Sequence, residues 1–154
     1  MGRPFTITRR TSIAANPATI HALVDDFHEW PTWSPWEDLD PALERSYSGP
    51  DQGVGARYAW KGNRKAGEGS MEITGLAPDA LDIELRFMKP WNATNQVRLG
   101  IAPTATGTDV TWTMRGEHVG LMGLLSRLMP MDKMVGKDFE KGLARLKAVA
   151  EQTG

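Results

Sequence analysis

Alternating apolar and polar residues predict three strands in the second half of the chain. Apolar side chains occupy every second position in residues 81–87, 97–101 and 110–114. Successive side chains of a strand point to opposite faces of the sheet, so each segment places its apolar residues on one face and its polar residues on the other. Each segment is therefore predicted to be a strand with one buried face and one wet face.

Four more strands are predicted from short runs that are bounded by turn-forming residues. They cover residues 5–13, 43–48, 57–61 and 66–76. Glycine, proline, asparagine and aspartate favour tight turns, and such residues follow these runs. Together with the three alternating segments, they predict seven strands.

Helical spacing appears directly after the first predicted strand. Asn16 is a favourable N-cap and Pro17 suits the first helical position, and apolar residues then recur at helical spacing as far as Phe27. Pro31 and Pro35 exclude a long continuation, because an interior proline removes a backbone hydrogen bond and clashes with the preceding turn. We expect two short helices here, the second no more than a brief turn.

The C-terminal part of the chain returns to helical spacing. Its apolar residues form one stripe through residues 120–152, which is interrupted by Pro130. We expect a kink or a restart at this proline, with residues 137–151 as the more regular helix. This helix has the only apolar stripe long enough to cover the apolar face of the predicted sheet.

The order of these elements predicts the fold class. A strand, short helices, six strands and a long helix make an α+β domain, in which an antiparallel sheet carries its helices on one face. The chain has 154 residues, a size at which one core can form, and no repeat or linker divides it. We therefore expect a single domain over residues 1–154.

Composition narrows the possible functions. The chain is 40% hydrophobic and 24% charged, with a formal net charge of -1, so nucleic acid is not an expected partner. It has no cysteine, which excludes disulfides, thiolate catalysis and thiolate metal sites. No apolar run approaches the roughly 18 residues of a membrane span, and the N-terminus lacks the apolar core of a signal peptide. We expect a cytoplasmic protein without stable membrane insertion.

Few residues could act in catalysis or hold a metal. His21, His28 and His118 are not at the spacing of metal ligands, so neither a metal nor another cofactor is expected. The acidic loop with Glu37 and Asp38 is either a solvated turn or a source of one carboxyl at a pocket mouth. Together with His118, these two carboxylates are the candidates for a general acid or base.

Aromatic residues recur every third position through the proline-rich segment. The row consists of Phe27, Trp30, Trp33 and Trp36. At this spacing, part of the row can share one face of a tight turn. It is either an aromatic cluster that closes one end of the sheet or the rim of a pocket mouth.

Several strands and the C-terminal helix direct large apolar side chains toward the same interior. Methionine adapts to irregular space, so a methionine-rich seam between sheet and helix suits either loose packing or a deformable pocket. The expected ligand-binding residues are Trp33, Trp36, Tyr58, Trp60, Met71, Phe87, Val97, Leu99, Trp112, Met114, Met122, Leu125 and Met129.

Four segments resemble a known family. They are WPTWSPW at residues 30–36, residues 53–74, VTWTM at 110–114 and MDKMVGKDFEKGL at 131–143. They are similar to bacterial members of the polyketide cyclase/dehydrase and lipid-transport (SRPBCC) branch of the START-like superfamily. This resemblance implies a helix-grip fold, in which a seven-stranded curved antiparallel sheet wraps around a long C-terminal helix and encloses a cavity. Cyclases of this superfamily place polar groups in the cavity, whereas the inward positions predicted here are almost wholly apolar.

Three functions follow from this reading. The first is the binding or transport of an apolar small molecule, such as a lipid, a polyketide-like compound or an aromatic compound, by a monomer or weak homodimer. The second is an enzyme that acts on a hydrophobic substrate, and the third is a protein-interaction module without a ligand. An inward ionisable group would favour the enzyme, an apolar cavity the carrier, and a filled core with a surface aromatic patch the module.

Overall fold

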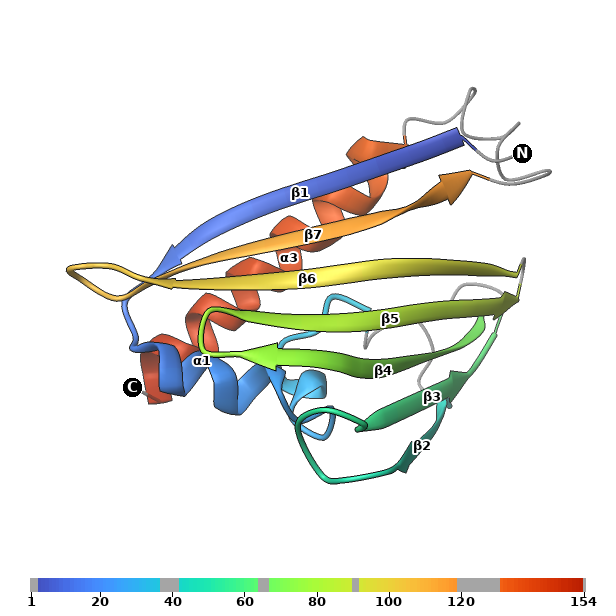
Figure 1. Cartoon of the computed structure of the whole chain (residues 1–154), viewed down its shortest axis with the longest axis horizontal. Coiled ribbons are helices and arrows are strands. Elements are labelled where there is room, and N and C mark those ends of the chain that lie inside the picture. The colour runs from blue at the N-terminus through green and yellow to red at the C-terminus, as the bar shows by residue number, and fades with distance from the viewer. Residues whose placement is uncertain (1–2, 37–41, 64–66, 90–91, 119–130, 154) are drawn as a thin grey trace.

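The fold of the chain is seen in a computed structural model (Figure 1). It describes residues 3–36, 42–63, 67–89, 92–118 and 131–153. The elements in chain order are β1 (Arg3–Ile13), α1 (Pro17–Val24), the 3-10 helix η1 (Trp30–Thr32), β2 (Glu44–Ser48), β3 (Arg57–Lys61), β4 (Glu68–Ala77), β5 (Ala80–Lys89), β6 (Ala93–Pro103), β7 (Thr108–His118) and α3 (Met131–Thr153).

The seven strands form one curved antiparallel sheet. Their order across the sheet is β1-β7-β6-β5-β4-β3-β2, so only the β1 to β7 pairing joins strands that are distant in the sequence. The two edge strands are therefore β1 and β2. The predicted α+β fold and its seven strands are confirmed.

The short helix α1 begins where the sequence predicts and ends at Val24, before Phe27. The side chain of Asn16 accepts a hydrogen bond from the backbone N–H of Thr19 at 2.9 Å, and Pro17 takes the first helical position. The second short helix, η1, is a single 3-10 turn around Pro31. Both expected short helices are present.

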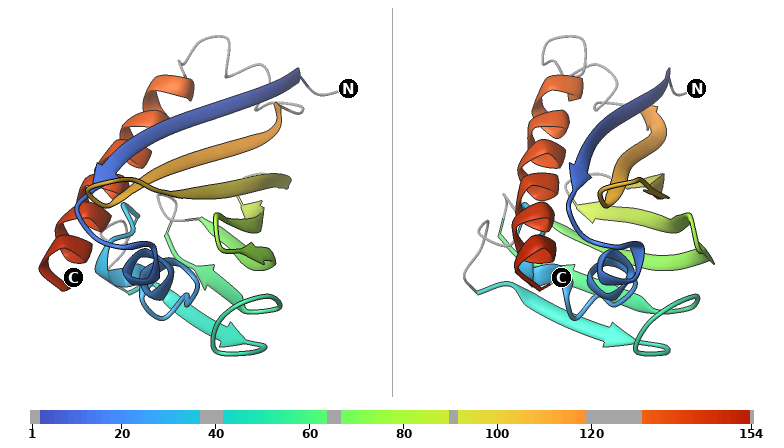
Figure 2. Two further views of the ribbon diagram at one scale, coloured as in Figure 1. Left: turned by 60° about the vertical axis from the view of Figure 1, so that its left-hand side comes forward. Right: turned by 90° about the vertical axis from the view of Figure 1, so that its left-hand side faces the viewer.

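The long helix α3 lies on the concave face of the sheet, mainly along β1 (Figure 2). Its buried stripe consists of Phe139, Leu143, Leu146 and Ala150. The helix begins at Met131, directly after Pro130. The predicted kink or restart at Pro130, and the predicted helical residues 120–130, lie outside the described residues.

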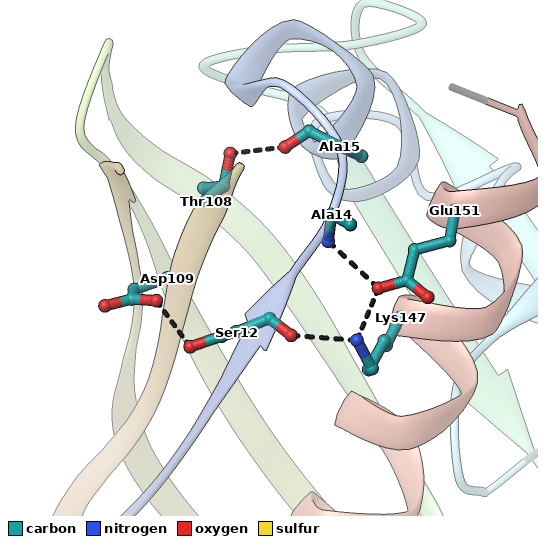
Figure 3. Close-up of polar contacts among 7 residues, drawn as sticks. All are labelled: Ser12, Ala14, Ala15, Thr108, Asp109, Lys147 and Glu151. Carbon is teal, nitrogen blue, oxygen red and sulfur yellow. Dashed lines mark hydrogen bonds and ion pairs between the residues drawn. The ribbon is translucent and has the colours of Figure 1, made fainter. Parts of the chain in front are cut away.

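Polar contacts fasten the C-terminal end of α3 to the end of β1 (Figure 3). Glu151 accepts a hydrogen bond from the backbone N–H of Ala14 at 2.9 Å, and Lys147 pairs with Glu151 and donates to the carbonyl of Ser12 at 3.1 Å. The Ala14 N–H and Lys147 lower the pKa of Glu151, since both favour the ionised carboxylate. This contact fixes the position of the helix over one edge of the sheet.

Candidate functional site

The strand registers arrange the inward side chains of the sheet in cross-strand rows. We call one row, at mid-sheet, the sealed row; it consists of Ile7, Ile73, Ile83, Val97 and Met114. The next row away from α1, the Asn95 row, consists of Phe5, Tyr58, Met71, Leu85, Asn95 and Gly116. The third, the outer row, consists of Trp60, Gly69, Phe87 and Ala93.

Exposure of these side chains increases from the sealed row outward. Every member of the sealed row is buried. In the Asn95 row, Leu85 and Asn95 are buried, whereas Tyr58 and Met71 are half-buried. In the outer row, Trp60 and Phe87 are also half-buried. The inward face is thus closed beside α1 and partly accessible at the opposite end.

Aromatic rings form a platform at the accessible end. The rings of Tyr58 and Trp60 lie nearly parallel, at 20° with centroids 6.0 Å apart, and Phe87 stands almost perpendicular to Trp60, at 84° and 5.9 Å. Gly69 allows this, because a Cβ there would come within 2.6 Å of the Trp60 ring. Trp60 therefore lies against the backbone of β4, with Phe87 as a wall beside it.

Trp112 is buried and occupies the centre of a second group of aromatic rings. Its ring stacks on Phe139 of α3, at 6° and a centroid distance of 4.2 Å, and meets Trp33 and Trp36 edge to face, both at 5.7 Å. Trp112 is 1% exposed, and its indole N–H has no hydrogen-bond partner among the described residues. A buried indole N–H ordinarily has one.

The other indoles of the proline-rich segment are hydrogen-bonded. Trp30 donates to the carbonyl of Val24 and Trp33 to that of Leu23, both at 2.9 Å, so these rings satisfy carbonyls at the end of α1. Trp36 is half-buried and donates to Asp138 of α3 at 3.2 Å. The aromatic row is thus part of the core from Phe27 to Trp33 and reaches partial exposure at Trp36.

Asn95 is a buried polar residue that the sequence analysis missed. It lies on the inward face of β6 and is 5% exposed. The expectation of an almost wholly apolar inward face is therefore corrected at this position. The alternation of Val97 and Leu99 in the sequence, continued by two residues, would have placed Asn95 on the same face.

Two histidines make ion pairs away from this face. His21 of α1 lies 3.0 Å from the Asp25 carboxylate and 2.9 Å from the carbonyl of Pro78 in the β4 to β5 turn. Burial lowers the pKa of His21, but the bonds to Pro78 and Asp25 outweigh this effect and raise it. The pKa of Asp25 is also raised, because the effect of burial exceeds the lowering effect of His21. His28 is exposed and pairs with Asp26 at 2.7 Å.

Some predicted site residues cannot be placed. Glu37, Asp38, Met122, Leu125 and Met129 lie outside the described residues, and His118 ends β7 with its side chain outside them. Of the predicted ligand-binding residues, Val97, Leu99 and Met114 are buried in the sheet's inward face. Within the described ranges, no group of three or more His, Asp or Glu side chains could hold a metal ion.

A small cleft that the sequence did not predict lies beside β2. It has a volume of about 160 Å³ and is lined by residues of the α1 to η1 loop and of β2, β3 and their connection. On its wall, the rings of His28 and Tyr47 stack with centroids 4.0 Å apart.

Comparison with known proteins agrees with this architecture. The fold is similar to that of protein CV1439 from Chromobacterium violaceum (16% identity, 95% of this chain and 97% of that chain, TM-score 0.67). It is also similar to the Aha1 dimer from Colwellia psychrerythraea (18% identity, 96% of each chain, TM-score 0.68). Norcoclaurine synthase from Thalictrum flavum, in complex with dopamine and hydroxybenzaldehyde, shares the fold at 8% identity (99% of this chain, 90% of that chain, TM-score 0.70).

At these identities the likeness shows the fold alone. No curated protein matches the sequence. Among the described residues, no helix is both long and apolar enough to cross a membrane. The family model described as "Polyketide cyclase / dehydrase and lipid transport" matches residues 4–151, and the chain therefore belongs to this family.

Proposed function

We propose that this protein binds an apolar small molecule between the inward face of the sheet and α3. The observation that carries the proposal is the partial exposure of the aromatic platform, Tyr58, Trp60 and Phe87, at one end of a face whose sealed row is buried. Contact between these apolar side chains and water raises the free energy by about 25 cal/mol per Å² of exposed apolar surface. An apolar ligand that covers the platform would remove this cost.

The family supports a ligand of this kind. Its description includes lipid transport and polyketide cyclisation, both of which involve molecules with a large apolar surface. The structurally similar norcoclaurine synthase was solved with two aromatic compounds. The described inward residues around the platform offer apolar contact and no acid or base pair, which favours binding over catalysis.

The aromatic row argues against a protein-interaction module. Such a module needs an exposed aromatic patch. Trp30 and Trp33 are instead buried, and their N–H groups are hydrogen-bonded inside the protein. The row therefore offers no such patch at these two positions.

Native mass spectrometry of the freshly purified protein tests the proposal. We expect a co-purified apolar compound. If none is found, we expect saturable binding of β-methylnaphthalene, measured by the quenching of tryptophan fluorescence. Phe87→Ala should weaken binding because it removes the wall of the platform. Met88→Ala is the matched control, since Met88 is the next residue of β5 and is exposed. A protein that carries no compound and binds no naphthalene probe would contradict the proposal.

A further inference from the structure

Asn95 places an amide group within an otherwise apolar part of the inward face. Its neighbours in the row are Leu85 on β5 and Gly116 on β7. Val97, two residues later in β6, belongs to the sealed row. Asn95 is 5% exposed. Among the described residues, none forms a hydrogen bond with its side chain. The Asn95 side chain is therefore mostly buried and has no hydrogen-bond partner among the described residues, although its amide atoms are not fully enclosed.

Such a group lowers the stability of the fold. An amide that is largely withdrawn from water without a hydrogen-bond partner is unfavourable, whereas an apolar side chain of similar shape would be favourable at the same place. Leucine has the same number of non-hydrogen side-chain atoms as asparagine and would continue the apolar row. Packing alone therefore gives no reason for an asparagine here.

The backbone opposite Asn95 leaves room for the amide. Gly116 has no side chain, and a Cβ there would overlap the Asn95 Oδ1 and come within 3.0 Å of the Phe5 ring. The amide consequently lies over the backbone of β7. This position is at the border between the sealed row and the half-buried rings of the accessible end.

We propose that Asn95 recognises a neutral hydrogen-bonding group of the ligand, such as a hydroxyl, carbonyl or amide, while the apolar body of the ligand rests on the platform of Trp60 and Phe87. This inference rests on the proposed function and adds its chemical class. The ligand is an amphipathic molecule with a flat or compact apolar part and an uncharged polar end. A pure hydrocarbon would leave the amide unpaired.

The surroundings of Asn95 determine that the recognised group is uncharged. The described side chains next to it, Leu85, Val97 and Phe5, are apolar. A carboxylate or phosphate at this place would lose its hydration and meet no counter-ion among them, which costs several kcal/mol. The amide, in contrast, offers both a donor and an acceptor to a neutral group.

A pair of probes of equal shape tests this recognition. β-Naphthol and β-methylnaphthalene differ by a hydroxyl in place of a methyl group. Their dissociation constants are measured by tryptophan fluorescence quenching for the wild type, Asn95→Leu and Gln96→Leu. Gln96 is the matched control, because it is an exposed amide on the other face of the same strand. Asn95→Ala is a second variant that cannot overfill the site.

The informative quantity is the ratio of the two dissociation constants. One hydrogen bond of about 1 kcal/mol corresponds to about fivefold in affinity, so both Asn95 variants should shift the ratio by about fivefold in favour of β-methylnaphthalene. Gln96→Leu should leave the ratio unchanged.

Each other result has a definite meaning. If both probes bind but the ratio is the same in wild type and Asn95→Leu, this inference is wrong and the proposed function stands. If the wild type binds neither probe, the proposed function is wrong and the inference with it. If β-naphthoate binds more tightly than β-naphthol, the recognised group is an anion and the assignment of a neutral group is wrong.

Discussion

At the scale of single residues, the Trp112→Phe variant tests whether Trp112 contacts the ligand or only packs in the core. Its N–H has no partner among the described residues, so Trp112→Phe removes no known hydrogen bond within the protein. We expect a modest loss of stability from the smaller ring. We also expect about a fivefold loss of affinity for the neutral naphthalene ketone prodan, whose carbonyl can accept a hydrogen bond worth about 1 kcal/mol.

Thr113→Val is the control for this experiment, because Thr113 lies on the opposite face of β7 and should not affect binding. The Trp112 prediction is wrong if Trp112→Phe leaves prodan affinity unchanged while Trp33→Phe abolishes it. The ligand would then lie against the aromatic row.

Gly142 shows how closely α3 approaches this aromatic cluster. A Cβ at Gly142 would come within 2.9 Å of both the Trp112 ring and the Pro35 ring. Alanine gains about 1 kcal/mol of helix propensity over glycine, but overpacking costs about 1–3 kcal/mol, and neither ring can turn aside. We expect Gly142→Ala to lower the free energy of unfolding by up to about 2 kcal/mol in urea titrations. Gly100→Ala, whose Cβ would have 3.7 Å of space, should be tolerated much better.

At the scale of elements, His21 joins α1 to the β4 to β5 turn in a pH-dependent manner. Its pKa in the folded protein is raised above the ordinary value of about 6.5. Protonation therefore stabilises the fold. This stabilisation is fully present below about pH 6.5 and is lost as the pH rises through the higher folded-state pKa.

Urea unfolding of the wild type and His21→Gln over a pH series measures this effect. The stability difference between them should be largest in mildly acidic solution and should shrink as the pH rises. A difference that is constant or grows with pH would refute the assignment.

At the scale of the whole molecule, amide exchange reports how the two ends of the inward face differ. The sealed row joins β1, β4, β5, β6 and β7, whereas β2 is an exposed edge strand. We expect the slowest exchange in β6 and β7 and fast exchange in β2. Equal protection of β2 and β6 would contradict this expectation.

The sequence by itself determined the elements of this fold. The period of two assigned one face of each strand to the interior, the Asn16 cap and Pro17 located α1, and the terminal apolar stripe identified the covering helix. These signals are local, since they depend on neighbouring residues of one segment. The same alternation would have placed Asn95 on the inward face.

Only the tertiary structure decided which inward residues meet and which remain accessible. The registers between strands brought Asn95 beside Gly116 and Trp60 onto Gly69, and the position of α3 along β1 left the platform partly uncovered. Hydrogen-bond satisfaction was also decided at this level, because Trp33 found a carbonyl of α1 while Trp112 found none among the described residues. These outcomes depend on pairings between distant segments, and the pattern within one strand carries no information about its partner's register.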